Sequence, residues 1–404
     1  MKIIFYIITF CSILFCQTSS LSIFGMGEYI DSYDASSMSM GDSKYFNGSS
    51  DNISFSSPSS YWKSSLSNLM MSINYSNISF SGGLDNTSEN NFRMIAFTFP
   101  VKENNVIAIG MNPLFRTDLA IEEQDYSFIP ANNSPTGEPL AFNTDYDFSG
   151  GMSEFFIIYS AKVSDNYSLG LRWSKIFGNS SHEYSLNLYD VSYDINGSIQ
   201  YNANDTEFFI DQNRYSSNKY LLELRYSIAK FESVFTYSKS SMLQLKVTPY
   251  YDTLGFLESQ SYYTSTKLFD KGLGIKYNLS NNSGISFEHH IVNPYSFYEF
   301  LNIFNDNTPD VKSYHLGAYL SKDTNIFKVG LFNKYYDFDD KSITDNGLTF
   351  GMRIKYFENK NSADIAFMIG ERSDVHGSIR KESYFKIMLT IVSGEEWFIN
   401  ERKK

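Results

Sequence analysis

The residues that could do chemistry in this chain are ten charged side chains, which fall at alternate positions of strand-like segments. They are Arg172, Glu223, Arg225, Glu232, Lys276, Glu288, Lys328, Arg353, Lys355 and Asp364. Because successive side chains of a strand point to opposite faces, we predict that all ten lie on one polar face. Charges on a buried face must be paired or hydrated, which favours a network of ion pairs that braces the fold. The alternative is a site in which Arg or Lys binds the carboxylate of a ligand. The four that we expect to bind a ligand or to contact an internal segment are Arg172, Glu223, Arg225 and Arg353.

Other reactive residue types form no catalytic or metal-binding pattern. Of the five histidines, His289 and His290 are adjacent, so on a strand they point to opposite faces and cannot bind one ion together. Both cysteines, Cys11 and Cys16, lie near the amino terminus, and no glycine-rich phosphate loop or Gly-x-Ser-x-Gly motif occurs. We therefore predict a protein that is not an enzyme and has no metal and no cofactor.

The segments that carry the charges alternate apolar and polar residues with a period of two. In the segment 347–357, apolar Leu348 and Phe350 alternate with Thr349 and Arg353. Fourteen segments of this kind lie between positions 69 and 392, and each has about ten residues, which is enough to cross a bilayer as a tilted strand. Two of them, 92–100 and 153–162, are apolar on both faces, so we expect them to pack against an internal segment.

The gaps between these segments alternate between short and long. The short gaps are 101–105, 163–166, 229–230, 280–283, 322–325 and 358–361. The long gaps are 81–91, 116–150, 178–218, 247–266, 293–312, 337–346 and 372–381. A soluble β-sandwich also alternates, but it has no reason to place every tight turn at one end. Outer-membrane barrels do so, because tight turns face the periplasm and long loops face outside.

The gap pattern therefore predicts an all-β fold, a closed antiparallel transmembrane barrel of 14 strands. Loops 116–150, 178–218 and 293–312 are expected outside, and both chain ends are expected in the periplasm. The stretch 183–201 also has strand character, but a further spanning strand would break the even count. We assign it to a hairpin within the external loop.

Export and composition agree with this interpretation. Lys2, the apolar run 3–15 and the small residues 18–20 are typical of a signal peptide, which we assign to residues 1–20. The remaining chain has no apolar run long enough for a membrane helix. It is rich in aromatic residues, with 31 Tyr and 35 Phe. The net charge of −12 argues against nucleic acid as a partner.

Residues 21–68 are rich in Ser, Asn, Asp and Gly and do not alternate. Their order resembles the opening of FadL/PorV-type outer-membrane proteins. The stretch 25–28 reads Gly-Met-Gly-Glu, Met40-Gly41 ends a stretch that begins at Ala35, and Pro58 lies between two serines. In that family Arg usually stands where this chain has Ser36, and Asn and Ala flank the proline. The end of the chain, 394–398, has the Trp and Phe of a terminal aromatic signal.

The resemblance implies a 14-stranded barrel with an amino-terminal plug or hatch. It divides the chain into a plug at 21–68, a barrel at 69–393 and a periplasmic tail at 394–404. The residues implied in holding the plug are Met40, Gly41 and Pro58. Asp31 and Asp34 are then candidate acidic partners of the lumenal arginines.

The resemblance also implies a function and partners. Relatives move hydrophobic small molecules across the outer membrane or act as partners in type IX secretion. Outer-membrane lipid is an expected partner, together with a hydrophobic small molecule or secretion-system proteins. Two other functions stay open: a surface scaffold or adhesin that acts through its long loops, and a soluble secreted β-sandwich that binds a ligand.

Overall fold

The computed structural model describes most of the chain. The described residues are 27–30, 32–48, 53–80, 87–122, 126–130, 139–193, 198–251, 261–295, 310–337, 342–357, 360–374 and 381–396. The predicted signal peptide lies outside the described residues, as do Asp31 and the aromatic residues at 397 and 398. No helix among the described residues is long and apolar enough to cross a membrane.

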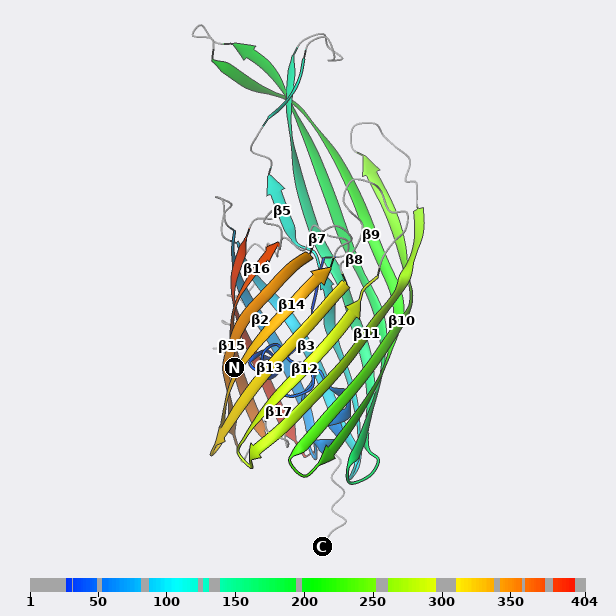
Figure 1. The fold of residues 1–404 in the computed structure, drawn as a ribbon. Helices are drawn as coiled ribbons and strands as arrows, with labels where there is room; N and C mark the ends of the chain where they lie inside the picture. Colours follow the sequence, from blue (N-terminus) through cyan, green and yellow to red (C-terminus); the bar gives the residue numbers. More distant parts are fainter. Residues whose placement is uncertain are drawn as a thin grey trace.

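Fourteen strands form one closed, antiparallel barrel (Figure 1). They are β2 (Ser67–Phe80), β3 (Thr87–Lys102), β4 (Asn105–Arg116), β7 (Leu140–Lys162), β8 (Tyr167–Tyr193), β9 (Ile199–Ile228), β10 (Phe231–Tyr251), β11 (Ser261–Ser280), β12 (Ser283–Asn293), β13 (Asp310–Lys322), β14 (Asn325–Asp337), β15 (Ser342–Tyr356), β16 (Asn361–Asp374) and β17 (Glu382–Glu395). The circuit closes where β17 pairs with β2, from Glu382↔Phe80 to Glu395↔Ser67. The predicted fold class and strand number are confirmed, and the two packed sheets of a sandwich are excluded.

The short connections all lie at one end of the barrel, as the gap pattern predicts. Between β3 and β4, and between the five other hairpin pairs at that end, only two to four residues separate the strands. Ala229, Asp323 and Phe357 in these turns have φ of 49°, 54° and 48°. This left-handed conformation matches the twist of a tight hairpin. Both β2 and β17 meet this end, at Ser67 and Glu395.

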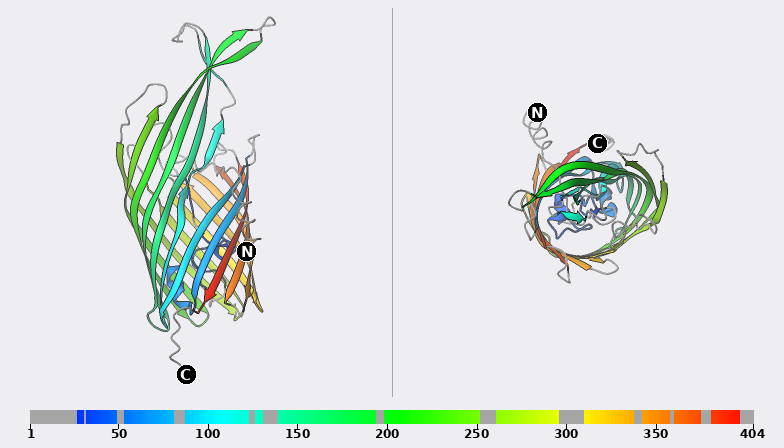
Figure 2. Two further views of the ribbon diagram at one scale, coloured as in Figure 1. Left: turned by 180° about the vertical axis from the view of Figure 1, so that it is seen from behind. Right: turned by 90° about the horizontal axis from the view of Figure 1, so that it is seen from above.

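At the opposite end of the barrel, two segments that were predicted as loops consist largely of strands. Residues 178–218 are mostly strand, because β8 and β9 stay paired from Tyr167↔Tyr226 up to Tyr193↔Ile199. The stretch 116–150 contains β5 (Leu119–Glu122), β6 (Ser127–Ile129) and the first part of β7. Figures 1 and 2 show β7 to β10 rising far beyond the other strands. The stretch 183–201 does belong to a hairpin beyond the barrel, but this hairpin continues β8 and β9 directly.

Polar strands can extend this far because side chains on neighbouring strands form hydrogen bonds with one another. Asn187 donates a hydrogen bond of 2.8 Å to Asp145 and accepts one of 3.0 Å from Thr206, so three strands are joined through one side chain. Apolar alternation is not needed where a ladder of backbone and side-chain hydrogen bonds continues in water. A prediction based on hydrophobic period alone therefore ended these strands too early.

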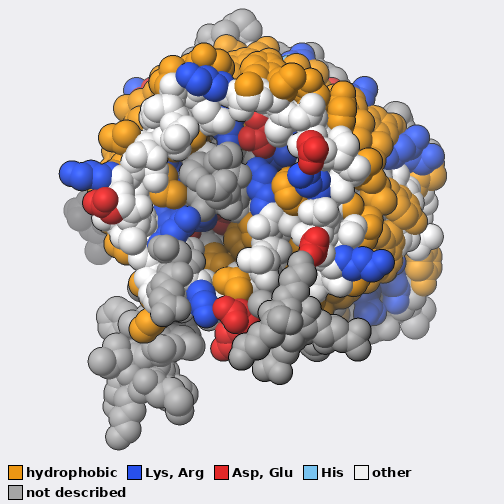
Figure 3. Space-filling view, turned by 90° about the horizontal axis from the view of Figure 1, so that it is seen from below, with side chains coloured by type: hydrophobic (Ala, Val, Ile, Leu, Met, Phe, Trp, Pro, Cys, Tyr) orange, Lys and Arg blue, Asp and Glu red, His pale blue; other side chains and the backbone are white. Residues whose placement is uncertain are grey.

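The outer and inner faces of the barrel differ as the alternation predicts. Leu224, Leu273, Leu331 and Phe350 face outward, with exposed fractions of 46–49%, whereas Arg225 is 3% exposed. Seen from the short-turn end, hydrophobic side chains surround the outside and charged side chains gather in and around the opening (Figure 3). The predicted strand parity is confirmed.

The described residues between Gly27 and Leu66 lie inside the barrel (Figure 2), and we call them the inner segment. It contains β1 (Glu28–Tyr29), α2 (Ala35–Met38) and η2 (Pro58–Lys63). Asp34 caps α2 by accepting a 2.9 Å hydrogen bond from Ser37 N–H, and Pro58 occupies the first turn of η2. β1 adds to the edge of β4, with Tyr29 opposite Phe115.

Candidate functional site

Glu223 of β9 binds the second half of the inner segment to the barrel wall. Its Oε1 accepts a 3.0 Å hydrogen bond from the Ser59 N–H and further hydrogen bonds from the hydroxyls of Ser57 and Ser59. Its Oε2 accepts one of 3.1 Å from Thr236 of β10. The side chain is fully buried. One oxygen of this carboxylate therefore holds the turn around Pro58, and the other is fixed by the neighbouring strand β10.

Arg225, two positions further on β9, completes this contact. Its Nε donates to Ser59 Oγ at 3.0 Å, and its Nη2 donates to the carbonyl of Tyr45 at 3.1 Å and to Ser57 Oγ at 2.6 Å. Its Nη1 pairs with Glu232 of β10. One guanidinium thus joins both halves of the inner segment to the wall.

Glu232 gathers three cations near the short-turn end. Besides Arg225 it pairs with Lys276 at 2.7 Å and with Lys63 of the inner segment at 3.5 Å. Burial lowers the pKa of Lys63 to about 8, although the attraction of Glu232 acts to raise it.

Glu288 of β12 holds the first half of the inner segment. It accepts hydrogen bonds from the successive backbone N–H groups of Lys44, Tyr45 and Phe46 at 2.7, 3.0 and 3.0 Å. Three amides that converge on one buried carboxylate form an anion nest, here occupied by a side chain of the wall. His290 Nε2 lies 3.0 Å from the same carboxylate.

Gly41 packs directly against the barrel wall, at a position too close to the strands for a larger residue. Its N–H donates to Thr349 at 2.8 Å, and its carbonyl oxygen lies 2.7 Å from His315 Nδ1. Its φ is +80°, and a Cβ built on Gly330 of β14 would lie 2.0 Å from its nitrogen. The preceding Met40 is fully buried against the wall residues Tyr319 and Ile326.

The four arginine and glutamate side chains singled out from the sequence do not form one site. Glu223 and Arg225 contact the inner segment, but Arg172 pairs with Glu154 of β7 and its guanidinium lies 4.0 Å from the Phe156 ring. Arg353 pairs with Asp364 at 2.8 Å on the other side of the barrel.

Asp364 also accepts from Lys328, which contacts Ser36 of α2. Asp34 hydrogen-bonds to Ser37 instead of pairing with an arginine, and burial raises its pKa despite these bonds. The candidate acidic partner thus has a capping role.

A second ionic cluster, centred on Arg372, was missed by the sequence analysis. Arg372 pairs with Asp345 at 2.9 Å, with Glu382 at 3.0 Å and with Glu28 of the inner segment. Burial acts to raise the pKa of Glu28, but Arg372 and Lys386 outweigh it and hold this pKa well below its ordinary value. Arg372 lies in a predicted loop, and only the register of β15 and β16 places it beside Asp345.

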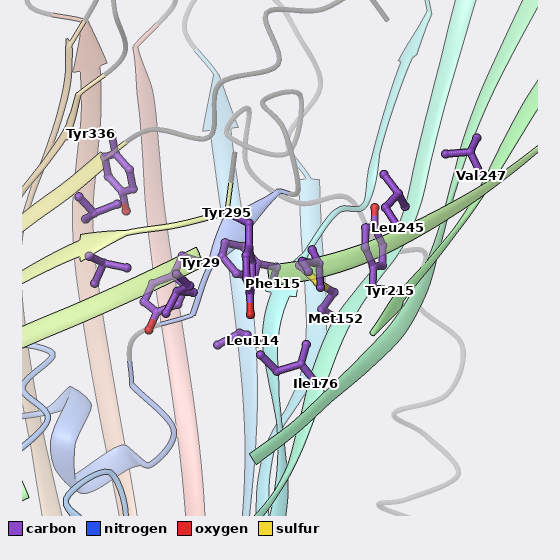
Figure 4. Close-up of a cluster of buried hydrophobic side chains, with 14 of the residues drawn as sticks. Tyr29, Leu114, Phe115, Met152, Ile176, Tyr215, Leu245, Val247, Tyr295 and Tyr336 are labelled. Carbon is purple, nitrogen blue, oxygen red and sulfur yellow. The ribbon is translucent and has the colours of Figure 1, made fainter. Parts of the chain in front are cut away.

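Toward the long-loop end the inner wall is apolar, which the predicted polar parity did not anticipate. Figure 4 shows this cluster, in which side chains from many strands converge. It comprises Tyr29, Leu114, Phe115, Met152, Ile176, Tyr215, Leu243, Leu245, Val247, Leu268, Val292, Tyr295, Val311, Tyr336 and Ile343. A separate apolar cluster joins Phe55 and Tyr61 of the inner segment to Met94 and Phe156, so β3 and β7 do pack on an internal segment as predicted.

The interior thus has two chemical zones. Near the short turns, charges and hydroxyls bind the inner segment. Toward the other end an apolar cluster lines much of the wall, beside the ion pairs of Arg372. The side chains of the apolar cluster offer hydrophobic contact surface. Among the described residues, no group of three His, Cys, Asp or Glu side chains could hold a metal ion.

Comparison with known proteins places the chain among barrels of one architecture. A family model described as BamG matches residues 1–404. No curated protein matches the sequence. The CymD monoaromatic hydrocarbon channel superimposes with a TM-score of 0.58 at 10% identity, covering 91% of this chain and 99% of the channel.

Two further solved structures are similar to the same extent. The Ralstonia pickettii toluene transporter TbuX gives a TM-score of 0.55 at 11% identity over 90% of this chain and 99% of its own. A Pseudomonas aeruginosa FadL homologue gives 0.56 at 11% identity over 91% and 98%. At these identities the similarity shows a shared fold. It confirms the FadL-type resemblance, whereas the type IX alternative gains no support from these matches.

Proposed function

The chain belongs to the BamG family, and from this premise and its fold we propose that it is an outer-membrane barrel that binds or passes hydrophobic small molecules. The inner segment serves as the plug in this proposal. The neighbouring structures are named as hydrocarbon channels and toluene transporters, which supports this class of cargo. It also supports the prediction that the chain is not an enzyme.

The observation that carries the proposal is the apolar cluster of the inner wall. Barrel interiors that hold water are polar, and the short-turn half of this one is strongly so. Leu243, Leu245 and Val247 of β10 are each at most 3% exposed and point inward together with Phe115. Apolar walls with few polar groups are the usual lining of sites for hydrophobic ligands.

The outer face supports placement of the barrel in the outer membrane. Apolar side chains surround the barrel, and its strands are long enough to cross a bilayer. In this placement the short turns face the periplasm, and the ends of β7 to β10 stand outside the cell. Proteolysis of intact cells should therefore cut within 116–150, 178–218 or 293–312, and not in the turns.

The plug role is tested by deleting residues 25–60 and measuring the leakage of small polar probes from liposomes. Removal of a plug should increase permeability in a barrel that still migrates as a folded species in cold SDS. Unchanged permeability with an intact barrel would favour the scaffold function instead.

Binding of a hydrophobic molecule is tested separately, with the fluorescent probe N-phenyl-1-naphthylamine. Leu245→Asp should abolish its binding, because a charge in an apolar wall repels an apolar ligand. Lys246→Asp, one position away, is the matched control and should leave binding unchanged. If both variants bound the probe equally, the apolar cluster would not be its binding site.

One observation favours a second candidate function, a surface scaffold or adhesin. The extension of β7 to β10 carries exposed aromatic side chains such as Phe208 of β9 and Tyr250 of β10, which are 36% and 52% exposed. Tyr126 stacks on Tyr201 with ring centroids 3.9 Å apart, so the extension is internally braced. Aromatic side chains on a rigid support are common in binding surfaces. Deletion of 183–201 should abolish partner binding while leaving permeability unchanged.

A further inference from the structure

The outer face of β8 to β11 has a groove of about 710 Å³. Three lysines, Lys175, Lys239 and Lys267, line it, and no Asp or Glu does. Within the described part of the chain, none of the three forms an ion pair, although Lys175 donates a 2.9 Å hydrogen bond to Ser216 and Lys239 lies over the Phe269 ring. Lys312 of β13, by contrast, pairs with Asp337. In a chain with a net charge of −12, this is a local concentration of positive charge.

Irregularities in two neighbouring strands form the groove. The register of β10 shifts between Ser240 and Gln244 against β9, and it shifts twice between Lys239 and Gln244 against β11. Bulges of this kind redirect side chains and often lie beside functional sites. Here they turn Met242 outward, 52% exposed.

Side-chain hydroxyls replace the ladder hydrogen bonds that the bulges remove. Ser265 Oγ accepts from Leu243 N–H at 3.1 Å, and Ser240 Oγ accepts from Leu268 N–H at 2.9 Å. Ser241 Oγ accepts from the N–H of Asn218 at 3.0 Å. The groove is therefore a built feature whose backbone groups are satisfied.

The groove lies at the upper border of the apolar belt. Lys239 follows the turn 229–230 by nine residues (239 − 230). At a rise of about 3.4 Å and a tilt of about 40°, it stands about 23 Å above that turn, near the top of a belt about 25 Å tall. Tyr220 is the register partner of both Lys239 and Trp173, so aromatic rings and lysine lie side by side. Aromatic and basic side chains at this height are typical of the membrane interface.

We propose that the groove binds a phosphate-bearing lipid of the outer leaflet. Lys175, Lys239 and Lys267 bind the phosphates, while Tyr220 and Met242 contact the upper part of the acyl chains, which continue over Leu222 and Leu224 below. Charge complementarity selects the anionic lipid, and the apolar belt beneath the lysines selects a lipid over a soluble anion. This inference rests on the proposed membrane placement but not on any role of the lumen.

The test is native mass spectrometry of the full chain in neutral detergent, with bis-phosphorylated lipid A as the probe. The variant combines Lys175→Gln, Lys239→Gln and Lys267→Gln, all at solvent-accessible positions. The control combines Lys312→Gln, Lys322→Gln and Lys381→Gln, which removes the same charge elsewhere. The groove variant should retain the lipid at least 10-fold less than the wild type, and the control should retain it unchanged.

Two further arms separate the alternatives. Inorganic phosphate at 10 mM should not displace the lipid; displacement would assign the groove to a soluble anion and overturn the lipid. Equal loss in both triple variants, or no loss in either, would likewise overturn the proposal. Liposome permeability of the groove variant should match that of the wild type, so a failure here leaves the test of the plug intact.

Discussion

The two faces of β9 carry opposite chemistry within four consecutive residues. Leu222 and Leu224 are 38% and 48% exposed on the outer face, while Glu223 and Arg225 are 0% and 3% exposed on the inner face. Outside, the side chains need only to be apolar. Inside, each charge has a specific partner, and the inner segment supplies many of these partners.

The difference teaches that the wall and the inner segment form one structural unit. Buried charges are costly unless they are paired, so a barrel that lost the segment would leave Glu223 and Glu288 without most of their donors. The outer face has no such dependence. Its exception is the lysine groove, whose three lysines form no ion pair within the described chain.

The largest effect on stability is expected from removing a buried charge on the inner face. Glu223→Ala leaves the donors around Ser57 and Ser59 without an acceptor and should lower the free energy of unfolding by about 3–5 kcal/mol. Urea titration in detergent, followed by the cold-SDS mobility shift, measures it. The control is Glu371→Ala, which removes an exposed ion pair with Lys381 and should cost about 0–1 kcal/mol. Similar losses from both would show that the inner charges are not special.

The outer face of the same strand is tested by adding a charge. Leu224→Arg places a guanidinium in the apolar belt and should cost about 2–4 kcal/mol. Ser227→Arg, on the inward parity near the short-turn end, should impair assembly less. Folded yield in liposomes compares the two variants. Equal yields would contradict the assignment of the faces.

The contact between the inner segment and the barrel wall is tested by Gly330→Ala. The added methyl group would collide with Gly41 and should cost about 1–3 kcal/mol, mainly by loosening the inner segment. Hydrogen exchange at 38–46 should become faster. Val329→Ala, on the outer face of β14, should leave that exchange unchanged, and faster exchange in both variants would point to a general loosening of β14.

The smallest effect concerns pH. The pKa of Lys63 is lowered to about 8 in the folded protein, so between pH 8 and 9 the unfolded state binds more protons than the folded state. The free energy of unfolding should therefore rise over this interval, by up to about 1.4 kcal/mol. In Lys63→Met the rise should be smaller than in the wild type. A fall in stability over the same interval would mean that Glu232 outweighs burial at this lysine.

Much of the barrel could be predicted because its signals are local. Leu348, Phe350 and Arg353 reveal their faces through their spacing alone, and the tight turns show which ends lie together. The extension of β7 to β10 could not be predicted in this way, because hydrogen bonds such as those of Asn187 maintain it without an apolar pattern. The inward charges that the sequence indicated were found without their partners, and the Arg372 cluster and the apolar part of the inner wall were not predicted.

The sequence by itself therefore determined the number of barrel strands, their outer faces and the polar character of the amino-terminal segment. Only the tertiary structure decided which charges meet: that Arg225 holds Ser57 and Ser59, that Arg172 holds Glu154, and that Arg372 gathers three acids. The reason is that a strand's period is written in neighbouring residues, whereas ion pairs across a lumen depend on the register of every strand and on closure of the whole barrel. The bulges in β10 belong to the same class, since a register shift exists only relative to the neighbouring strands.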